Sequence, residues 1–132
     1  MSKSIGNVVD PFEYIQEFGS DALRYFLMKE ISVEQDSVFA RDLFIECYNA
    51  DLANTYGNLV SRYIGMVQKY TNGNIRKGQE SLDQISTQLL NKTTETIKSV
   101  FDCIDNLKVT NLISNILDLA RLANKYVEDT KP

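Results

Sequence analysis

Apolar side chains recur every three or four residues over most of the chain, which is the spacing of one face of a helix. Runs of this kind cover residues 22–30, 39–70, 82–104 and 109–129. The clearest positions are Leu52, Tyr56, Leu59, Val60, Tyr63, Val67 and Tyr70. No segment shows the alternation of a strand. The pattern therefore predicts an all-α fold, an antiparallel helical bundle preceded by a short loop and connecting helices.

Capping residues mark where several helices begin and end. Asp10 followed by Pro11 predicts the start of a first short helix, because a carboxylate can cap a helix and proline suits its first position. Ser20 or Asp21 is expected to cap a second helix. Residues 71–74, Thr-Asn-Gly-Asn, predict the end of the long helical stretch.

Two details of the long stretch depend on packing. Asn49-Ala50-Asp51 could divide it into two helices, because Asn and Asp side chains compete for backbone hydrogen bonds. Tyr56, Tyr63 and Tyr70 recur every seven residues and coincide with the apolar face. We expect core packing for these tyrosines, although rings at this spacing could also stack on bases.

Composition narrows the class of protein. The chain has 132 residues, of which 43% are hydrophobic and 24% charged, as in one soluble globular domain or one domain plus a strip of a neighbour. It contains no apolar run of membrane-spanning length and no histidine. A zinc site or a Ser-His-Asp triad is therefore not expected. Cys47 and Cys103 stand alone, which suggests buried thiols in a reducing, cytoplasmic setting.

Charge is unevenly distributed. The formal net charge is −4, which argues against a general DNA or RNA binder. Residues 52–79 nevertheless contain no Asp or Glu, and they carry Arg62, Lys69, Arg76 and Lys77. A basic stripe on an acidic body could follow a phosphate backbone. The acidic row of Glu13, Glu17 and Asp21 is expected to be solvated surface.

A row of polar residues runs along the basic segment. Asn54, Asn58 and Arg62 are each four residues apart, so they lie on one helix face, and Lys69 extends the row. An amide beside a guanidinium can bond the edge of an unpaired base, and a guanidinium can also stack on it. The spacing is equally that of the solvent-facing side of an amphipathic helix.

The first seven residues, Met-Ser-Lys-Ser-Ile-Gly-Asn, suit phosphate. Ser2, Lys3 and Ser4 place one ammonium between two hydroxyls, with backbone N–H groups nearby. The segment resembles the KMSKS signature of class I aminoacyl-tRNA synthetases without its first lysine. The resemblance implies that Ser2, Lys3 and Ser4 form the ATP loop, in which Lys3 stabilises the phosphates during amino-acid activation.

Two further segments resemble the methionyl-tRNA synthetase family, namely residues 19–27 (Gly-Ser-Asp-Ala-Leu-Arg-Tyr-Phe-Leu) and Asn49 through Arg62. The resemblance implies a methionine–tRNA ligase as the parent enzyme, using ATP with magnesium. It assigns residues 1–37 to the signature loop and connecting helices, and residues 38–132 to the anticodon-binding bundle. Asn58 and Arg62 would then recognise the anticodon of the methionine tRNA, with Asn54 and Lys69 beside them.

The chain also departs from the family pattern. The family places a tryptophan after a proline like Pro132, whereas this sequence contains no Trp. The catalytic α/β domain is expected upstream, so we interpret the chain as a fragment that is inactive and binds no cofactor alone. The alternatives are a class I synthetase for leucine, isoleucine, valine or cysteine, and a helical protein-interaction module without an RNA role.

Overall fold

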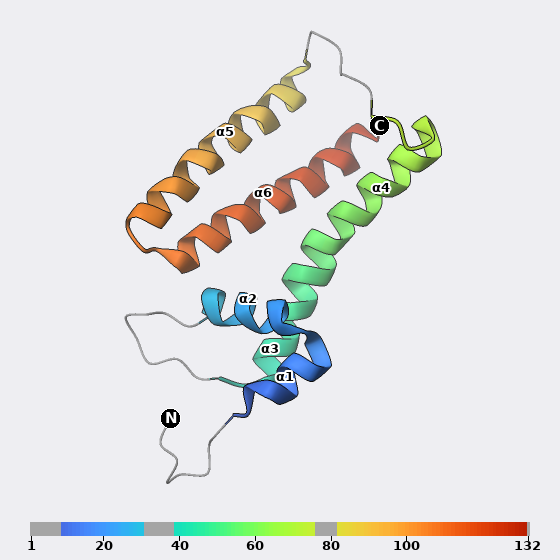
Figure 1. Cartoon of the computed structure of the whole chain (residues 1–132). Coiled ribbons are helices and arrows are strands. Elements are labelled where there is room, and N and C mark those ends of the chain that lie inside the picture. Colours follow the sequence, from blue (N-terminus) through green and yellow to red (C-terminus); the bar gives the residue numbers. More distant parts are fainter. Residues whose placement is uncertain (1–8, 31–38, 76–81, 132) are drawn as a thin grey trace.

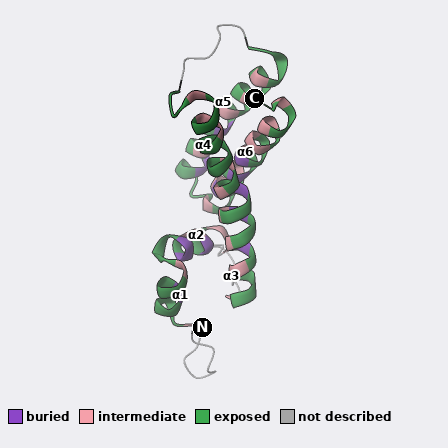
Figure 2. Cartoon of the chain, turned by 90° about the vertical axis from the view of Figure 1, so that its right-hand side faces the viewer, coloured by how far each residue is buried: buried purple, intermediate pink, exposed green. Residues whose placement is uncertain are grey.

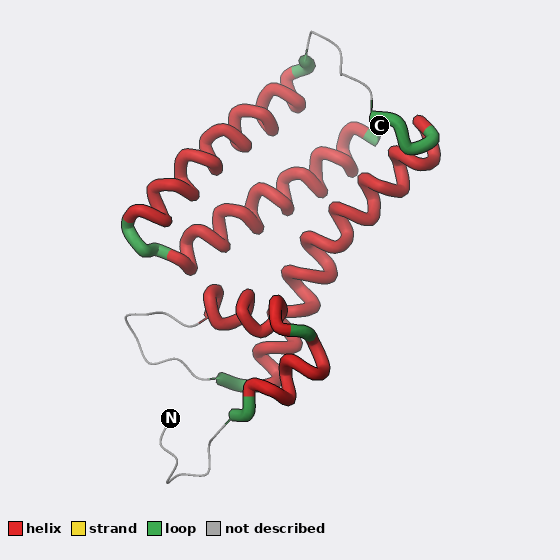
Figure 3. Tube along the Cα trace, in the orientation of Figure 1, coloured by secondary structure: helices red, strands yellow, loops and turns green. Residues whose placement is uncertain are grey.

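A computed structural model of the chain describes residues 9–30, 39–75 and 82–131, and every element in these ranges is helical (Figure 3). This confirms the predicted all-α class. The elements are α1 (Pro11–Phe18), α2 (Ser20–Glu30), α3 (Arg41–Cys47), the π-helical segment η2 (Tyr48–Gly57), α4 (Asn58–Thr71), α5 (Gln84–Asp105) and α6 (Val109–Thr130).

The helix ends follow from local side-chain chemistry. Asp10 caps α1 by accepting a hydrogen bond from the Phe12 N–H at 2.9 Å, and Pro11 occupies the first helical position, as the sequence predicts. At the end of α4, Asn72 adopts the left-handed conformation with a φ of 50°. Asp83 caps α5 by accepting from the Ser86 N–H at 2.7 Å, so that helix begins two residues later than the apolar pattern suggests.

The helical stretch is continuous from Arg41 to Thr71, so Asn49-Ala50-Asp51 does not divide it. These residues instead lie in η2, where the turns are wider than in an α-helix. A side chain at Gly57 would meet the carbonyl oxygen of Leu52 at 3.0 Å, which favours glycine where the wide turns end. The hydroxyl of Thr55 donates to the Ala50 carbonyl at 2.8 Å inside the same segment.

The long helices form the upper part of the molecule (Figure 1). α5 and α6 lie antiparallel and pack along their length, as expected for bundle neighbours. α6 also contacts η2, α4 and α2, so it packs against α2 as well as against its bundle neighbours. None of the described helices is both long and apolar enough to cross a bilayer.

The best-buried part of the core lies between α1, α2 and α3 (Figure 2). Phe26 and Phe44 are each 1% exposed, and their ring centroids lie 5.1 Å apart. The cluster comprises Tyr14, Ala22, Leu23, Phe26, Phe44 and Cys47. It takes side chains from both sides of residue 37, so the division into two domains there stays a proposal.

A charged contact covers the edge of this core. Arg41 donates to both carboxylate oxygens of Glu17, at 2.7 and 2.6 Å, and its guanidinium lies 5.6 Å from the ring centroids of Tyr14 and Phe18. Glu17 therefore fastens α1 to α3, in addition to lying at the surface. On the outer side of α1, Phe12 remains 68% exposed.

The prediction for the three tyrosines was wrong. Tyr56, Tyr63 and Tyr70 are 57%, 47% and 61% exposed. The reason is that α4 contacts α6 at few places and has no buried residue of its own, so much of its apolar face is uncovered in the described chain. Periodicity identified the face correctly, but only the arrangement of helices decides which face is covered.

Candidate nucleic-acid interface

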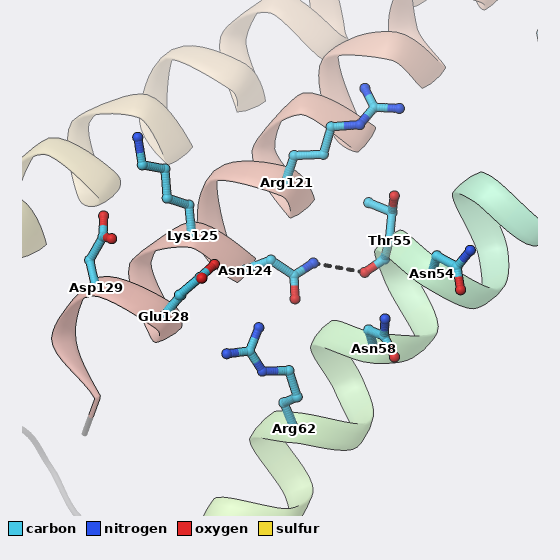
Figure 4. A pocket seen from close by; sticks show the side chains of 9 residues that line it. All are labelled: Asn54, Thr55, Asn58, Arg62, Arg121, Asn124, Lys125, Glu128 and Asp129. Carbon is cyan, nitrogen blue, oxygen red and sulfur yellow. Dashed lines mark hydrogen bonds between the residues drawn. The ribbon is translucent and has the colours of Figure 1, made fainter.

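The predicted polar row lies at the surface and lines a groove. Asn54 projects from η2, and Asn58 and Arg62 project from the first two turns of α4; all three are exposed (Figure 4). They form one wall of an open groove with a volume of about 570 Å³. The three side chains that the spacing placed on one face are therefore accessible from outside.

The opposite wall comes from α6, whose place beside the row on α4 does not follow from the sequence. Its side chains are Arg121, Asn124, Lys125, Glu128 and Asp129. They recur at three- and four-residue steps, so they form a polar face of the same kind as the row on α4. That spacing was a usable signal, but the sequence alone does not say which of the two rows faces the other.

Asn124 fastens the two walls together. Its side-chain N–H₂ group donates to the backbone carbonyl of Thr55 in η2 at 2.9 Å and to the Ala120 carbonyl at 3.2 Å. The side-chain oxygen of Asn124 is buried and has no hydrogen-bond partner in the described chain. A buried amide oxygen without a donor is unfavourable, so this atom is a site for a donor from water or from a ligand.

The first wall keeps its hydrogen-bonding capacity. Within the described residues, the side chains of Asn54 and Asn58 form no hydrogen bond, and Arg62 forms neither a hydrogen bond nor an ion pair. The groove has mixed charge, because the α6 wall carries Arg121 and Lys125 together with Glu128 and Asp129, and it faces Arg62 on the other wall. The basic stripe of the sequence is thus opposed by two carboxylates where it meets α6.

Lys69 lies in a second hollow that adjoins the first. The two hollows share Arg62 and Glu128, and the second has a volume of about 470 Å³. The ammonium of Lys69 lies 5.0 Å from the ring centroid of Tyr70, a cation–π contact at the surface. The predicted row of four residues therefore lines two adjoining hollows, with Arg62 at their junction.

A buried carboxylate lies directly behind the groove. Asp51, in η2, is 2% exposed and accepts hydrogen bonds from Tyr25 at 3.0 Å, from Lys29, and from Arg121 at 3.2 Å. Burial alone would raise the pKa of Asp51, but the hydrogen bonds from Lys29 and Tyr25 outweigh it and lower the pKa below its ordinary value. Asp51 is therefore an ion at neutral pH.

The pKa values of the groups around Asp51 are raised, whereas that of Asp51 is lowered. Burial, followed by the hydrogen bond to Asp51, raises the pKa of Tyr25. Burial acts to lower the pKa of Lys29, yet the hydrogen bond to Asp51 raises it overall. Burial also raises the pKa of the Cys47 thiol to about 11. All three groups therefore hold their protons more tightly in the folded chain than in free solution.

The ATP-loop residues Ser2, Lys3 and Ser4 lie outside the described residues. In the described ranges, no group of three or more His, Cys, Asp or Glu side chains gathers as metal ligands would. Cys47 and Cys103 are both buried and form no disulfide.

Comparison with known proteins places the chain in context. Residues 1–64 match the model of a family described as tRNA synthetases class I (M). The whole chain aligns with methionine–tRNA ligases of Ureaplasma parvum at 41% identity and Clostridium tetani at 42% identity. It spans 25% and 20% of the length of these two relatives.

Solved structures agree with the sequence relatives. The chain superposes over its full length on methionyl-tRNA synthetase of Mycobacterium tuberculosis in complex with methionyl-adenylate, with a TM-score of 0.93 and 31% identity, and covers 26% of that chain. The apo form from the same organism gives a TM-score of 0.88 at 28% identity over 95% of this chain. Each of these relatives and solved structures is named as a methionine enzyme.

Proposed function

We propose that this chain belongs to the methionyl-tRNA synthetase family and is a segment of a methionine–tRNA ligase. In that ligase, the chain would recognise the anticodon of the tRNA. The observation that carries the proposal is the exposed row of Asn54, Asn58 and Arg62 along a groove closed on its other side by α6. The ligase would attach methionine to its tRNA with ATP. The catalytic α/β domain would belong to the same protein.

The chemistry of the groove favours unpaired bases over phosphate. Base edges carry both donors and acceptors, and amide side chains can match either. The guanidinium of Arg62 can donate two parallel hydrogen bonds or stack on a base. Glu128 and Asp129 would repel a phosphate placed between the walls, so the sugar-phosphate backbone is expected to follow the rim near Lys69 and Lys125.

Asn124 extends the proposed reading site beyond the row on α4. Its unpartnered side-chain oxygen lies between the walls, where the close-up view places it near Arg62 and Asn58 (Figure 4). With a rotation of the Asn124 side chain toward the groove, an exocyclic amine of an unpaired base would supply the donor that this buried oxygen lacks. A base without such an amine would leave the oxygen unpaired and would be disfavoured.

Binding experiments with RNA hairpins test the proposal. The hairpins carry the methionine anticodon or single-base changes of it, and affinity is measured for the chain and for a ligase that contains it. Replacing Arg62 by Ala should weaken binding of the methionine anticodon by about 1–3 kcal/mol, the value of a good bidentate base contact. The hairpins with changed bases should lose much less.

The matched control is Arg24→Ala, which removes another exposed arginine, on α2 and outside the groove. It should leave the affinity for every hairpin within about twofold of the original, because the charge of a single rim residue acts weakly and without base selectivity. Equal losses for all anticodons in Arg62→Ala would show that Arg62 contacts only phosphate, and base reading by this face would be refuted.

The second part of the proposal concerns ATP. The donor set of Ser2, Lys3 and Ser4 fits phosphate, and in a ligase working with ATP and magnesium it would stabilise the charge that develops during amino-acid activation. Lys3→Ala in the complete ligase should slow methionine-dependent pyrophosphate exchange and leave tRNA affinity nearly unchanged. An unchanged exchange rate would remove Lys3 from activation. We place the ligase in the cytoplasm, in keeping with two free buried cysteines.

A further inference from the structure

The buried carboxylate behind the groove joins three parts of the fold. Asp51 belongs to η2, its Oδ2 atom accepts from Tyr25 and Lys29 of α2, and its Oδ1 atom accepts from Nη2 of Arg121 on α6 at 3.2 Å. The thiol of Cys47 also lies 3.7 Å from Oδ2. These partners are 26, 22, 70 and 4 residues away along the chain.

The charges around this carboxylate nearly balance. Lys29 and Arg121 place two positive charges on one Asp51, and Glu30, 3.2 Å from the Lys29 ammonium, offsets one of them. A buried carboxylate with both oxygens occupied by charged donors is held in one orientation, because any rotation would leave a donor unpaired. Asp51 is thus a rigid point to which the helices are attached.

Arg121 links that point to the groove. Its Nη2 atom donates to Asp51, its Nη1 atom donates to Asp118 at 2.8 Å, and the side chain is 53% exposed on the α6 wall. One carboxylate partner is buried and the other, Asp118, is 64% exposed. The guanidinium is therefore fixed mainly from behind, by a residue that does not itself reach the groove.

We infer that Asp51 is a positioning residue: it holds Arg121 in place on the wall opposite Asn58 and Arg62 and, through Tyr25 and Lys29, ties that wall to α2. This inference rests on the proposed function, because it concerns how the same groove meets RNA. An arginine held by a carboxylate is presented in one geometry, and less conformational entropy is lost when RNA binds. The same carboxylate makes the position of the wall depend on α2, the second helix after the ATP-loop segment.

A double-mutant cycle on hairpin binding tests the inference. Asp51→Asn keeps the size of the side chain and removes its charge; it should weaken binding of the methionine-anticodon hairpin by about threefold or more, the lower end of coupling between residues in contact. Arg121→Ala should cause a similar loss. The double variant should lose no more than Arg121→Ala alone, since Asp51 acts through Arg121. If the affinity losses of the two single variants multiply in the double variant, the inference is overturned.

Two further variants separate positioning from charge and from general stability. Asp118→Asn removes the exposed partner of Arg121 and should change affinity less than twofold. Arg121→Lys keeps the positive charge at a half-exposed position, so this variant should remain folded. It therefore tests the inference even if Asp51→Asn unfolds the chain. It should bind nearly as weakly as Arg121→Ala, because an ammonium lacks the planar fork that bonds Asp51 and Asp118 together. Full affinity in Arg121→Lys would overturn the inference.

The outcomes also distinguish this inference from the proposed function. Affinities are measured at a temperature where circular dichroism shows each variant fully folded. Anticodon-selective binding by the original chain that persists unchanged in Asp51→Asn overturns the inference alone. Absence of selective binding by the original chain overturns the proposed function and the inference with it.

Discussion

Stability at alkaline pH offers a direct test of the cluster around Asp51. Burial holds the Cys47 thiol protonated up to a pKa of about 11, against 9.0 for the free side chain, and Cys47 is only 4% exposed. The folded-state pKa is the raised one. Between pH 9 and 11 the folded chain therefore binds more protons than the unfolded chain, and the free energy of unfolding must decrease as the pH rises.

The structure gives the size of the effect. A difference of two pKa units in one group corresponds to about 2–3 kcal/mol of stability, which is fully present below pH 9 and lost by pH 11. Tyr25 and Lys29 add to the loss, because their pKa values are also raised in the folded chain. All three contributions have the same sign, so the total decrease should be at least that of Cys47.

Urea unfolding followed by circular dichroism at pH 8, 9, 10 and 11 measures the decrease. Cys47→Ala provides the comparison: it lowers stability at pH 8 by leaving a small cavity, but its decrease between pH 9 and 11 should be smaller than that of the original chain by about 2 kcal/mol. Equal decreases in both chains would show that the Cys47 thiol is not held protonated, and the reasoning from its burial would fail.

Two other predictions concern the core and the buried carboxylate. Phe44→Ala should reduce the free energy of unfolding by about 3–5 kcal/mol, because Phe44 is 1% exposed and contacts several aromatic rings. Thermal or urea unfolding measures this loss, and a loss below about 1 kcal/mol would contradict the packing of Phe44. Asp51→Asn should cost about 3 kcal/mol at pH 7, because it leaves Lys29 without its buried partner, whereas Asp118→Asn should cost about 0.5 kcal/mol or less. Similar losses for both carboxylates would contradict the central role of Asp51.

Much of the local structure could be predicted from the sequence. The start of α1 at Asp10-Pro11 and the end of the long stretch at Asn72 were correct, because caps and stop signals act over four or five residues. The fold class followed from apolar spacing for the same reason. The wide turns of η2 were not predicted, because a π-helical segment has no sequence signature comparable to a cap.

The candidate site was predicted only in part. The row on α4 was found because its members are four residues apart, and it proved to be exposed. Asn124 and Arg121 were not included, because nothing local shows that α6 packs beside η2 and α4. Asp51 was treated as a possible helix breaker, and its partners Lys29 and Arg121 are 22 and 70 residues away.

Interactions within one or two helical turns fix which segments are helical, where several helices begin and end, and that Asn58 and Arg62 share one helix face, so these features follow from the sequence. The tertiary structure alone decided that Tyr63 is uncovered and that α6 forms the second wall of the groove. It also decided that Asp51 is buried among donors from three helices. Those features depend on which helices pack together, and packing between distant segments is set by the whole fold.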